Sequence, residues 1–193
     1  MDSLQEYFRQ ACIGNLCKEY LALWRGCGQD NEKLIRLALN QQSQPHMMHY
    51  SYMGRGLTKE YITERFKDYI NGRRTLENCD MVSGYTYQIF VDYNGIVDVT
   101  SDVTTFMYCD DVTLVVPITK CPVIYCGCKT QMHIVANGYN TLKIYLFDES
   151  KVTIDDTDNE SKVTVFRYSD DARVEKGCYC FGTVKDFRKE LRL

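Results

Sequence analysis

The sequence has little proline, tryptophan and histidine: 3 prolines, 1 tryptophan and 3 histidines among 193 residues. No apolar run approaches the ~18 residues that a membrane span needs. Neither a glycine-rich phosphate loop nor the Gly-x-Ser-x-Gly turn of serine hydrolases is present. These absences argue against a membrane-spanning protein, a P-loop nucleotide hydrolase and an α/β-hydrolase, and nothing in the pattern calls for a cofactor.

No secretory signal is recognisable either, because the start Met1-Asp-Ser-Leu-Gln-Glu6 has no basic residue and no apolar core. We therefore expect the protein to be made in the cytoplasm. In such a compartment its 10 cysteines act as thiols that behave like small buried hydrophobes, and they do not form a disulfide framework.

Charge is unevenly distributed along the chain. The formal net charge is −3, too small to steer the whole molecule toward nucleic acid, so we expect no nucleic-acid partner. Residues 80–182, however, carry 15 acidic and 8 basic side chains, whereas residues 1–79 carry 9 acidic and 11 basic ones. The middle of the chain is therefore its acidic part.

A repeat organises residues 94–182. The sequence Ser150-Lys-Val-Thr-Ile154 returns as Ser161-Lys-Val-Thr-Val165 and more loosely as Ala172-Arg-Val-Glu175, in steps of eleven residues. Most units hold a short alternating apolar core, which places the apolar side chains on one face of a strand. Such cores are Val112, Leu114 and Val116; Leu142, Ile144 and Leu146; Val152 and Ile154; Val163 and Val165.

A single strand of this kind cannot bury its apolar face, but units of near-constant length can stack on one another. The pattern predicts a β-solenoid or β-roll in which neighbouring units cover each other, with Val152 stacked near Val163. An antiparallel β-sandwich is the alternative, because its strands also come every 8–12 residues with polar turns between them.

Helical spacing of apolar residues dominates the region before the repeat. The fold class is therefore α+β, with a helical head at residues 1–79 before the solenoid at residues 80–182. We expect a loop from Gln41 to Gly56 and a first strand from Tyr85 to Val91. The expected helices are 3–11, 15–24, 31–39 and 58–70.

The tail, residues 183–193, changes its period once more. Val184, Phe187 and Leu191 lie three and four residues apart, with basic side chains between them. We interpret this short amphipathic segment as a cap that covers the last unit, since the terminal units of stacked arrays must be atypical.

Two Cys-x-Cys pairs are the first candidate for chemistry, and the four thiols are Cys126, Cys128, Cys178 and Cys180. Residues i and i+2 of a strand share a face, so the thiols could meet and hold zinc. Structural zinc sites usually space their cysteines more widely on a turn. We therefore expect no metal and two inward-facing pairs in the solenoid core.

The expected loop contains the second candidate, His46-Met-Met-His49. A histidine pair three apart on a helical turn could ligate a metal, but no carboxylate is close in sequence. Packing against the helices is the expected role. The same stretch offers a weak partner surface made of Met47, Met48, Tyr50, Tyr52 and Met53.

Acidic pairs recur where we expect turns, at Asp110-Asp111, at Asp155-Asp156 with Asp158, and at Asp170-Asp171. Paired carboxylates could hydrolyse glycosides, and acidic turns could hold calcium. The glycine-rich calcium repeat is missing. Turn formation is therefore the expected role of these residues, and no catalytic residue is assigned.

Several passages of the chain carry a resemblance to known proteins. They are Glu6-Tyr-Phe-Arg-Gln-Ala-Cys12 with Cys17-Lys-Glu-Tyr20, Asn137-Gly-Tyr-Asn-Thr-Leu-Lys-Ile-Tyr145, Asp148-Glu-Ser-Lys-Val152 and Arg167-Tyr-Ser-Asp-Asp-Ala-Arg-Val174. These passages resemble uncharacterised proteins of gut Bacteroidales and of the crAss-like phages and prophages that infect them. In that group a short helical region precedes a repetitive β tract. The resemblance implies a phage or mobile-element origin and adds the virion as a second location, but it brings no catalytic residues.

Three functions follow as hypotheses. The leading one is a non-enzymatic, phage-associated structural or binding protein that presents its solenoid surface to a protein partner or to itself. The enzymatic alternative is carbohydrate processing on the acidic β surface, which requires two carboxylates at glycosidase separation. The third is an intracellular effector that binds a host protein through an exposed apolar patch on the helical head.

Overall fold

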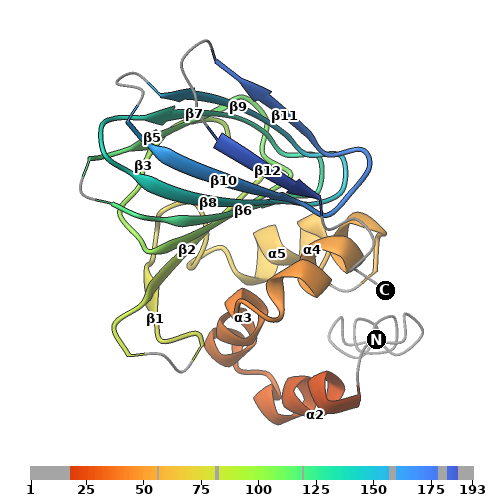
Figure 1. The fold of residues 1–193 in the computed structure, drawn as a ribbon. Coiled ribbons are helices and arrows are strands. Elements are labelled where there is room, and N and C mark those ends of the chain that lie inside the picture. Colours follow the sequence, from red (N-terminus) through yellow and green to blue (C-terminus); the bar gives the residue numbers. More distant parts are fainter. Residues whose placement is uncertain are drawn as a thin grey trace.

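The computed structural model describes residues 18–55, 57–80, 83–118, 120–156, 160–177 and 182–186. Short helices at the beginning of the chain pack beside a β-solenoid of about five turns (Figure 1). The described helices are α2 (Lys18–Cys27), α3 (Asn31–Leu39), α4 (Gln44–Tyr52) and α5 (Lys59–Arg65). The fold class expected from the sequence is therefore confirmed.

The solenoid consists of two sheets that face each other across an apolar interior. Sheet A has the order β1-β2-β4-β6-β8-β10-β12, and sheet B has the order β11-β9-β7-β5-β3. All neighbouring strands are parallel except β1 and β2. The strands are β1 (Leu76–Glu77), β2 (Thr86–Val91), β3 (Gly95–Asp98), β4 (Val103–Met107), β5 (Val112–Val116), β6 (Val123–Gly127), β7 (Gln131–Ala136), β8 (Thr141–Leu146), β9 (Lys151–Asp156), β10 (Lys162–Arg167), β11 (Arg173–Lys176) and β12 (Gly182–Asp186).

The eleven-residue unit is half of a coil, which corrects the expected stacking. Ser150-Lys-Val-Thr-Ile154 leads into β9 of sheet B, whereas Ser161-Lys-Val-Thr-Val165 leads into β10 of sheet A. Val152 therefore pairs with Met132 and Val174 in its own sheet and not with Val163. Both valines still point inward and are buried in the same core. The two sheets bury equivalent apolar faces, so their sequences look alike although they do not stack.

The recurring serine of these units has a structural role at the turns. Ser150 Oγ donates a hydrogen bond to the carbonyl of Cys126 at 3.2 Å, and Ser161 Oγ donates one to the carbonyl of Gly138 at 2.6 Å. Thr130 and Asn140 hold the corresponding places and donate to Gly127 and Asn137. These buried side chains satisfy turn carbonyls that would otherwise lose hydrogen bonds on leaving water.

The corner that follows each of the strands β2, β4, β6 and β8 of sheet A adopts a left-handed conformation. Asp92, Tyr108, Cys128 and Asp148 follow β2, β4, β6 and β8, with φ values of 52°, 55°, 55° and 53°. Aspartate tolerates this conformation, whereas tyrosine and cysteine adopt it rarely. The corner therefore imposes the same direction change on successive coils, even where the residue type is unfavourable.

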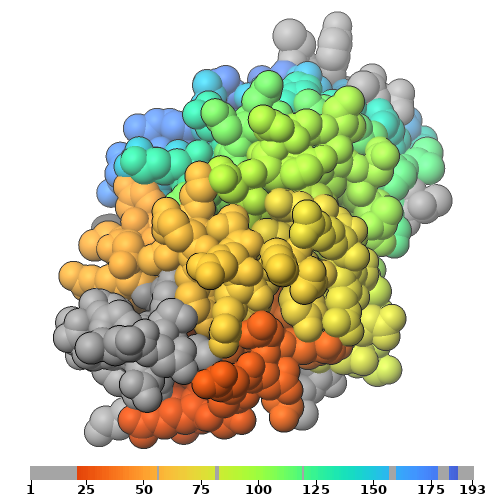
Figure 2. Space-filling model, turned by 180° about the vertical axis from the view of Figure 1, so that it is seen from behind, coloured from red at the N-terminus to blue at the C-terminus, as the bar shows by residue number. Residues whose placement is uncertain are grey.

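A second core lies between the helices and the outer face of sheet A, the face directed away from sheet B. Leu34, Ile35, Met48 and Ile62 from the helices join Tyr87 and further residues of sheet A there. Figure 2 shows the helices, in orange and yellow, directly against the first coils, in green. Farther along this face, the rings of Tyr125, Tyr145 and Phe166 stack with centroid separations of 4.7 and 4.6 Å.

The helical region differs from the sequence expectation in three places. Helix α3 and the Thr58 cap of α5 are confirmed, but α5 ends at Arg65 and Ile70 instead forms a bridge with Ile89 of β2. The expected loop contains the helix α4. The expected helix 15–24 is described from Lys18 and continues to Cys27, while the expected helix 3–11 lies outside the described residues.

The end of the repetitive tract also differs. Residues 182–186 form β12, which pairs with β10 and continues sheet A, so Val184 belongs to a strand in register with Val165. Val184 is about one-third exposed. The other two residues of the expected cap, Phe187 and Leu191, lie outside the described residues.

Candidate binding surface

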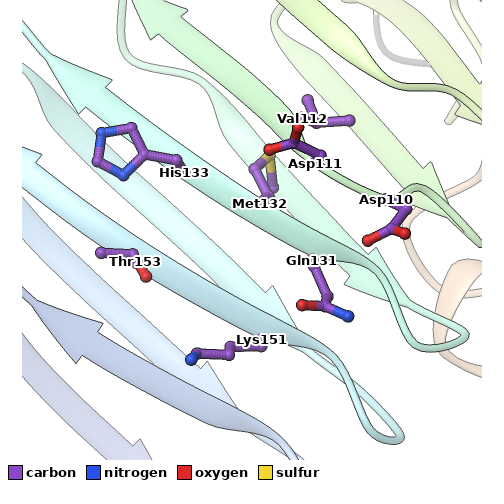
Figure 3. A pocket seen from close by; sticks show the side chains of 8 residues that line it. All are labelled: Asp110, Asp111, Val112, Gln131, Met132, His133, Lys151 and Thr153. Carbon is purple, nitrogen blue, oxygen red and sulfur yellow. The ribbon is translucent and has the colours of Figure 1, made fainter.

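A hollow of about 210 Å³ opens on the outer face of sheet B, the side away from the helices. The parallel register builds it, because Gln131 pairs with Lys151 and His133 pairs with Thr153 on the neighbouring strands β7 and β9. Figure 3 shows these side chains together with Asp110 and Asp111, which come from the turn before β5. The remaining lining residues are Val112 and Met132.

The basic side chains of this hollow already have acidic partners. His133 Nε2 lies 3.2 Å from Asp155 Oδ2, and Lys151 Nζ lies 2.9 Å from Glu175 Oε1. In contrast, no cation among the residues that the structure describes lies within ion-pair distance of Asp110 or Asp111, and both residues are exposed. The hollow therefore offers two carboxylates beside an amide, an imidazole and a hydroxyl group.

The acidic pairs expected at turns divide into two kinds. Asp110-Asp111 lies at a turn as expected. Asp155 and Asp156 instead end the strand β9, and Asp156 is buried and accepts hydrogen bonds from the backbone N–H and the hydroxyl group of Ser161. The part of the chain that the structure describes brings no three His, Cys, Asp or Glu side chains together in a way that could hold a metal ion.

The histidine pair lies on α4, where that helix contacts the coil turns. His49 Nδ1 is 3.5 Å from Asp148 Oδ1 in the turn between β8 and β9, and Asp148 also accepts the backbone N–H of Cys128 at 3.1 Å. Burial lowers the pKa of His46, and the electrostatic effect of neighbouring His49 lowers it by a smaller amount. The His49–Asp148 contact joins the helical region to the solenoid.

The cysteines near this junction differ from the expected pair. Cys126 points into the solenoid interior, whereas Cys128 occupies the left-handed corner and faces α4, so the two do not share a face. The Cys128 thiol donates to the carbonyl of Met48 at 3.3 Å, and burial raises the pKa of both thiols. A protonated, inaccessible thiol is a poor nucleophile. Cys178 and Cys180 lie outside the described residues.

The methionine–tyrosine stretch is mostly an internal contact. Met47 and Met48 are buried, so they are not available to a partner, while Tyr50 and Tyr52 are half-buried. Tyr52 donates a hydrogen bond to Glu149 and lies under the ammonium group of Lys129. Met53, the last residue of the expected partner surface, is 50% exposed and remains available for contact.

The hollow was not recognised from the sequence, although a signal for it exists. Asp111, Gln131 and Lys151 are spaced by twenty residues, as are Thr113, His133 and Thr153. That spacing equals one coil between β5, β7 and β9. Reading the chain in steps of eleven residues separates these side chains, whereas reading it in steps of twenty places each set in one row.

No protein-family model matches this chain, and the comparisons with curated proteins and with solved structures also find no match. Among the described residues, no helix combines the length and the apolar character that crossing a membrane requires.

Proposed function

We propose that the protein is a non-enzymatic, phage-associated binding protein that contacts a protein partner through the outer face of sheet B. The observation that carries this proposal is the asymmetry of the two outer faces. The helices pack on sheet A, while no described helix covers the outer face of sheet B. There Ile96 is 71% exposed, and Val115 and Val135 on the neighbouring strands are partly exposed.

A rigid support strengthens the proposal. Each strand of sheet B is fixed by parallel pairing and by the interior core, so the spacing of its outward side chains is preset. A preorganised surface loses little conformational freedom on binding, which favours affinity. The phage association is supported by the resemblance of the N-terminal and repeat motifs.

Buried thiols favour binding over thiol catalysis. His49 and Cys128 both contact Asp148, but the Cys128 thiol is fully buried and burial raises its pKa. A thiol in this state cannot reach a substrate or attack it as a thiolate.

The proposal is tested by placing a photo-crosslinking amino acid at Thr113, on the outer face of sheet B, or at Lys33, an exposed residue of α3. The variants are expressed in infected cells, and the particles are purified and analysed by mass spectrometry. We expect a protein crosslink from Thr113 and none from Lys33. Crosslinks from Lys33 alone would overturn the proposal in favour of binding through the helical head.

A further inference from the structure

We infer that the outer face of sheet B is built for a basic protein surface and that the hollow receives one arginine side chain of that partner. The inference rests on the proposed function, because it names the chemistry of the same surface. The first argument is charge. Among the described residues, five carboxylates lie on this face, whereas its basic groups are Lys151, Arg173 and the imidazole of His133. The carboxylates are Asp98, Asp110, Asp111, Asp155 and Glu175.

The second argument concerns which of these charged groups lack a partner of opposite charge among the described residues. Lys151 and His133 already contact Glu175 and Asp155, so added anions would compete with existing pairs. Asp110 and Asp111 have no such partner in the described chain and stand at one end of the hollow (Figure 3). A cationic group that enters there gains charge-assisted hydrogen bonds without displacing another cation.

The third argument is size and shape. At about 210 Å³ the hollow is smaller than the ~300–1,000 Å³ typical of small-molecule pockets, so it suits one side chain. A guanidinium group presents a planar fork of donors to neighbouring carboxylates, whereas an ammonium group is a single point of charge. Val112 and Met132 border the hollow and offer apolar contact to the methylene stem of the arginine.

The experiment titrates the isotope-labelled full chain with Nα-acetyl-arginine amide and follows the backbone amide resonances. Nα-acetyl-citrulline amide is the matched probe, because it has nearly the same shape without the charge. We expect the arginine probe to shift the resonances of Asp110, Asp111, Gln131 and His133, with a dissociation constant on the order of millimolar. The citrulline probe leaves them in place.

Two variants complete the test. Asp110→Asn with Asp111→Asn removes both charges, and asparagine tolerates the left-handed backbone of Asp111. We expect this double variant to weaken arginine binding by about tenfold or more, as expected for the loss of a charge-assisted hydrogen bond. Asp98→Asn removes a charge from the same face outside the hollow, and its effect should stay within about twofold because a distant exposed charge is screened.

Three outcomes would overturn the inference: equal shifts by the citrulline probe, equal weakening by Asp98→Asn, or shifts at the hollow only with methyl glucoside. The last outcome would assign the hollow to a carbohydrate. Failure of the hollow is distinguishable from failure of the proposed function, because the crosslink from Thr113 reports on the face and does not require the carboxylates.

Discussion

Replacing Gly127 by alanine should loosen the helix α4 from the solenoid. Gly127 ends β6, and a Cβ added to it would lie 2.8 Å from Sδ, 3.0 Å from Cβ and 3.1 Å from Cγ of Met48. All three distances are shorter than ordinary van der Waals contact, and Met48 is fully buried on α4. Because neither the strand end nor the helix can yield freely, we expect a loss of about 1–3 kcal/mol in the free energy of unfolding.

Met48→Ala provides the second arm of a double-mutant cycle. Alone it removes Cγ, Sδ and Cε and leaves a cavity, which should cost about 2–5 kcal/mol. It also removes two of the three atoms that the new Cβ would meet. The double variant should therefore be more stable than the sum of the single effects predicts, by about 1 kcal/mol.

Denaturant unfolding of the full chain, followed by circular dichroism, measures these differences. Gly26→Ala is the matched control, because nothing lies within 4 Å of the added Cβ and the residue belongs to the helix α2. That change should stabilise the protein slightly, since alanine favours a helix over glycine. Strict additivity of Gly127→Ala and Met48→Ala would refute the close packing of α4 on β6.

Three further predictions concern side chains described above. Asp156→Ala should destabilise the protein by about 1–3 kcal/mol because the buried N–H of Ser161 loses its acceptor, whereas Asp98→Ala on the exposed face should change the denaturation midpoint little. Hydrogen bonding to Glu149 raises the pKa of Tyr52 from 10 to about 12. The stabilisation from this group is therefore present below pH 10 and is lost as the pH rises from about 10 to 12. Ultraviolet titration of the protein and of Tyr52→Phe measures the pKa of Tyr52, and an ionisation near 10 would contradict the prediction. Burial raises the pKa of Cys79 to about 12 and of Cys109 to about 11. A thiol reagent at neutral pH should therefore modify the exposed Cys121 well before these two cysteines. Peptide mass spectrometry measures the three rates, and equal rates would contradict the burial of Cys79 and Cys109.

Alternation of apolar residues predicted the inward residues, because each strand has one buried face, and the repeated units favoured the solenoid over the alternative β-sandwich. Neither signal could identify which units stack, since Val152 and Val163 enter the same core from opposite sheets. Backbone pairing between coils joins strands that are about twenty residues apart and not strands that are eleven residues apart. The sequence of a single unit does not reveal which of the two strands it pairs with. The side chains of the hollow come together only when strands twenty residues apart are paired, so the hollow was not predicted from the sequence.

Helix α4 was missed for a different reason. Its buried positions are Gln44, Met47, Met48 and Ser51, which have helical spacing but include two polar residues. Gln44 accepts a hydrogen bond from Thr105 at 2.6 Å, and Ser51 hydrogen-bonds with Tyr108 at 2.9 Å. Polar side chains that are buried because the solenoid supplies their partners cannot be distinguished, in sequence, from solvated ones.

The alternation of sheet B also separates two kinds of evolutionary constraint. Leu114, Ile134 and Ile154 face the interior and determine whether the coils hold together, whereas Thr113, His133 and Thr153 sit one position away and face solvent. Changes in the second set leave the backbone pairing and the core untouched. The outer face can therefore change while the coil beneath it stays intact, and a library randomised at these three positions should yield folded proteins.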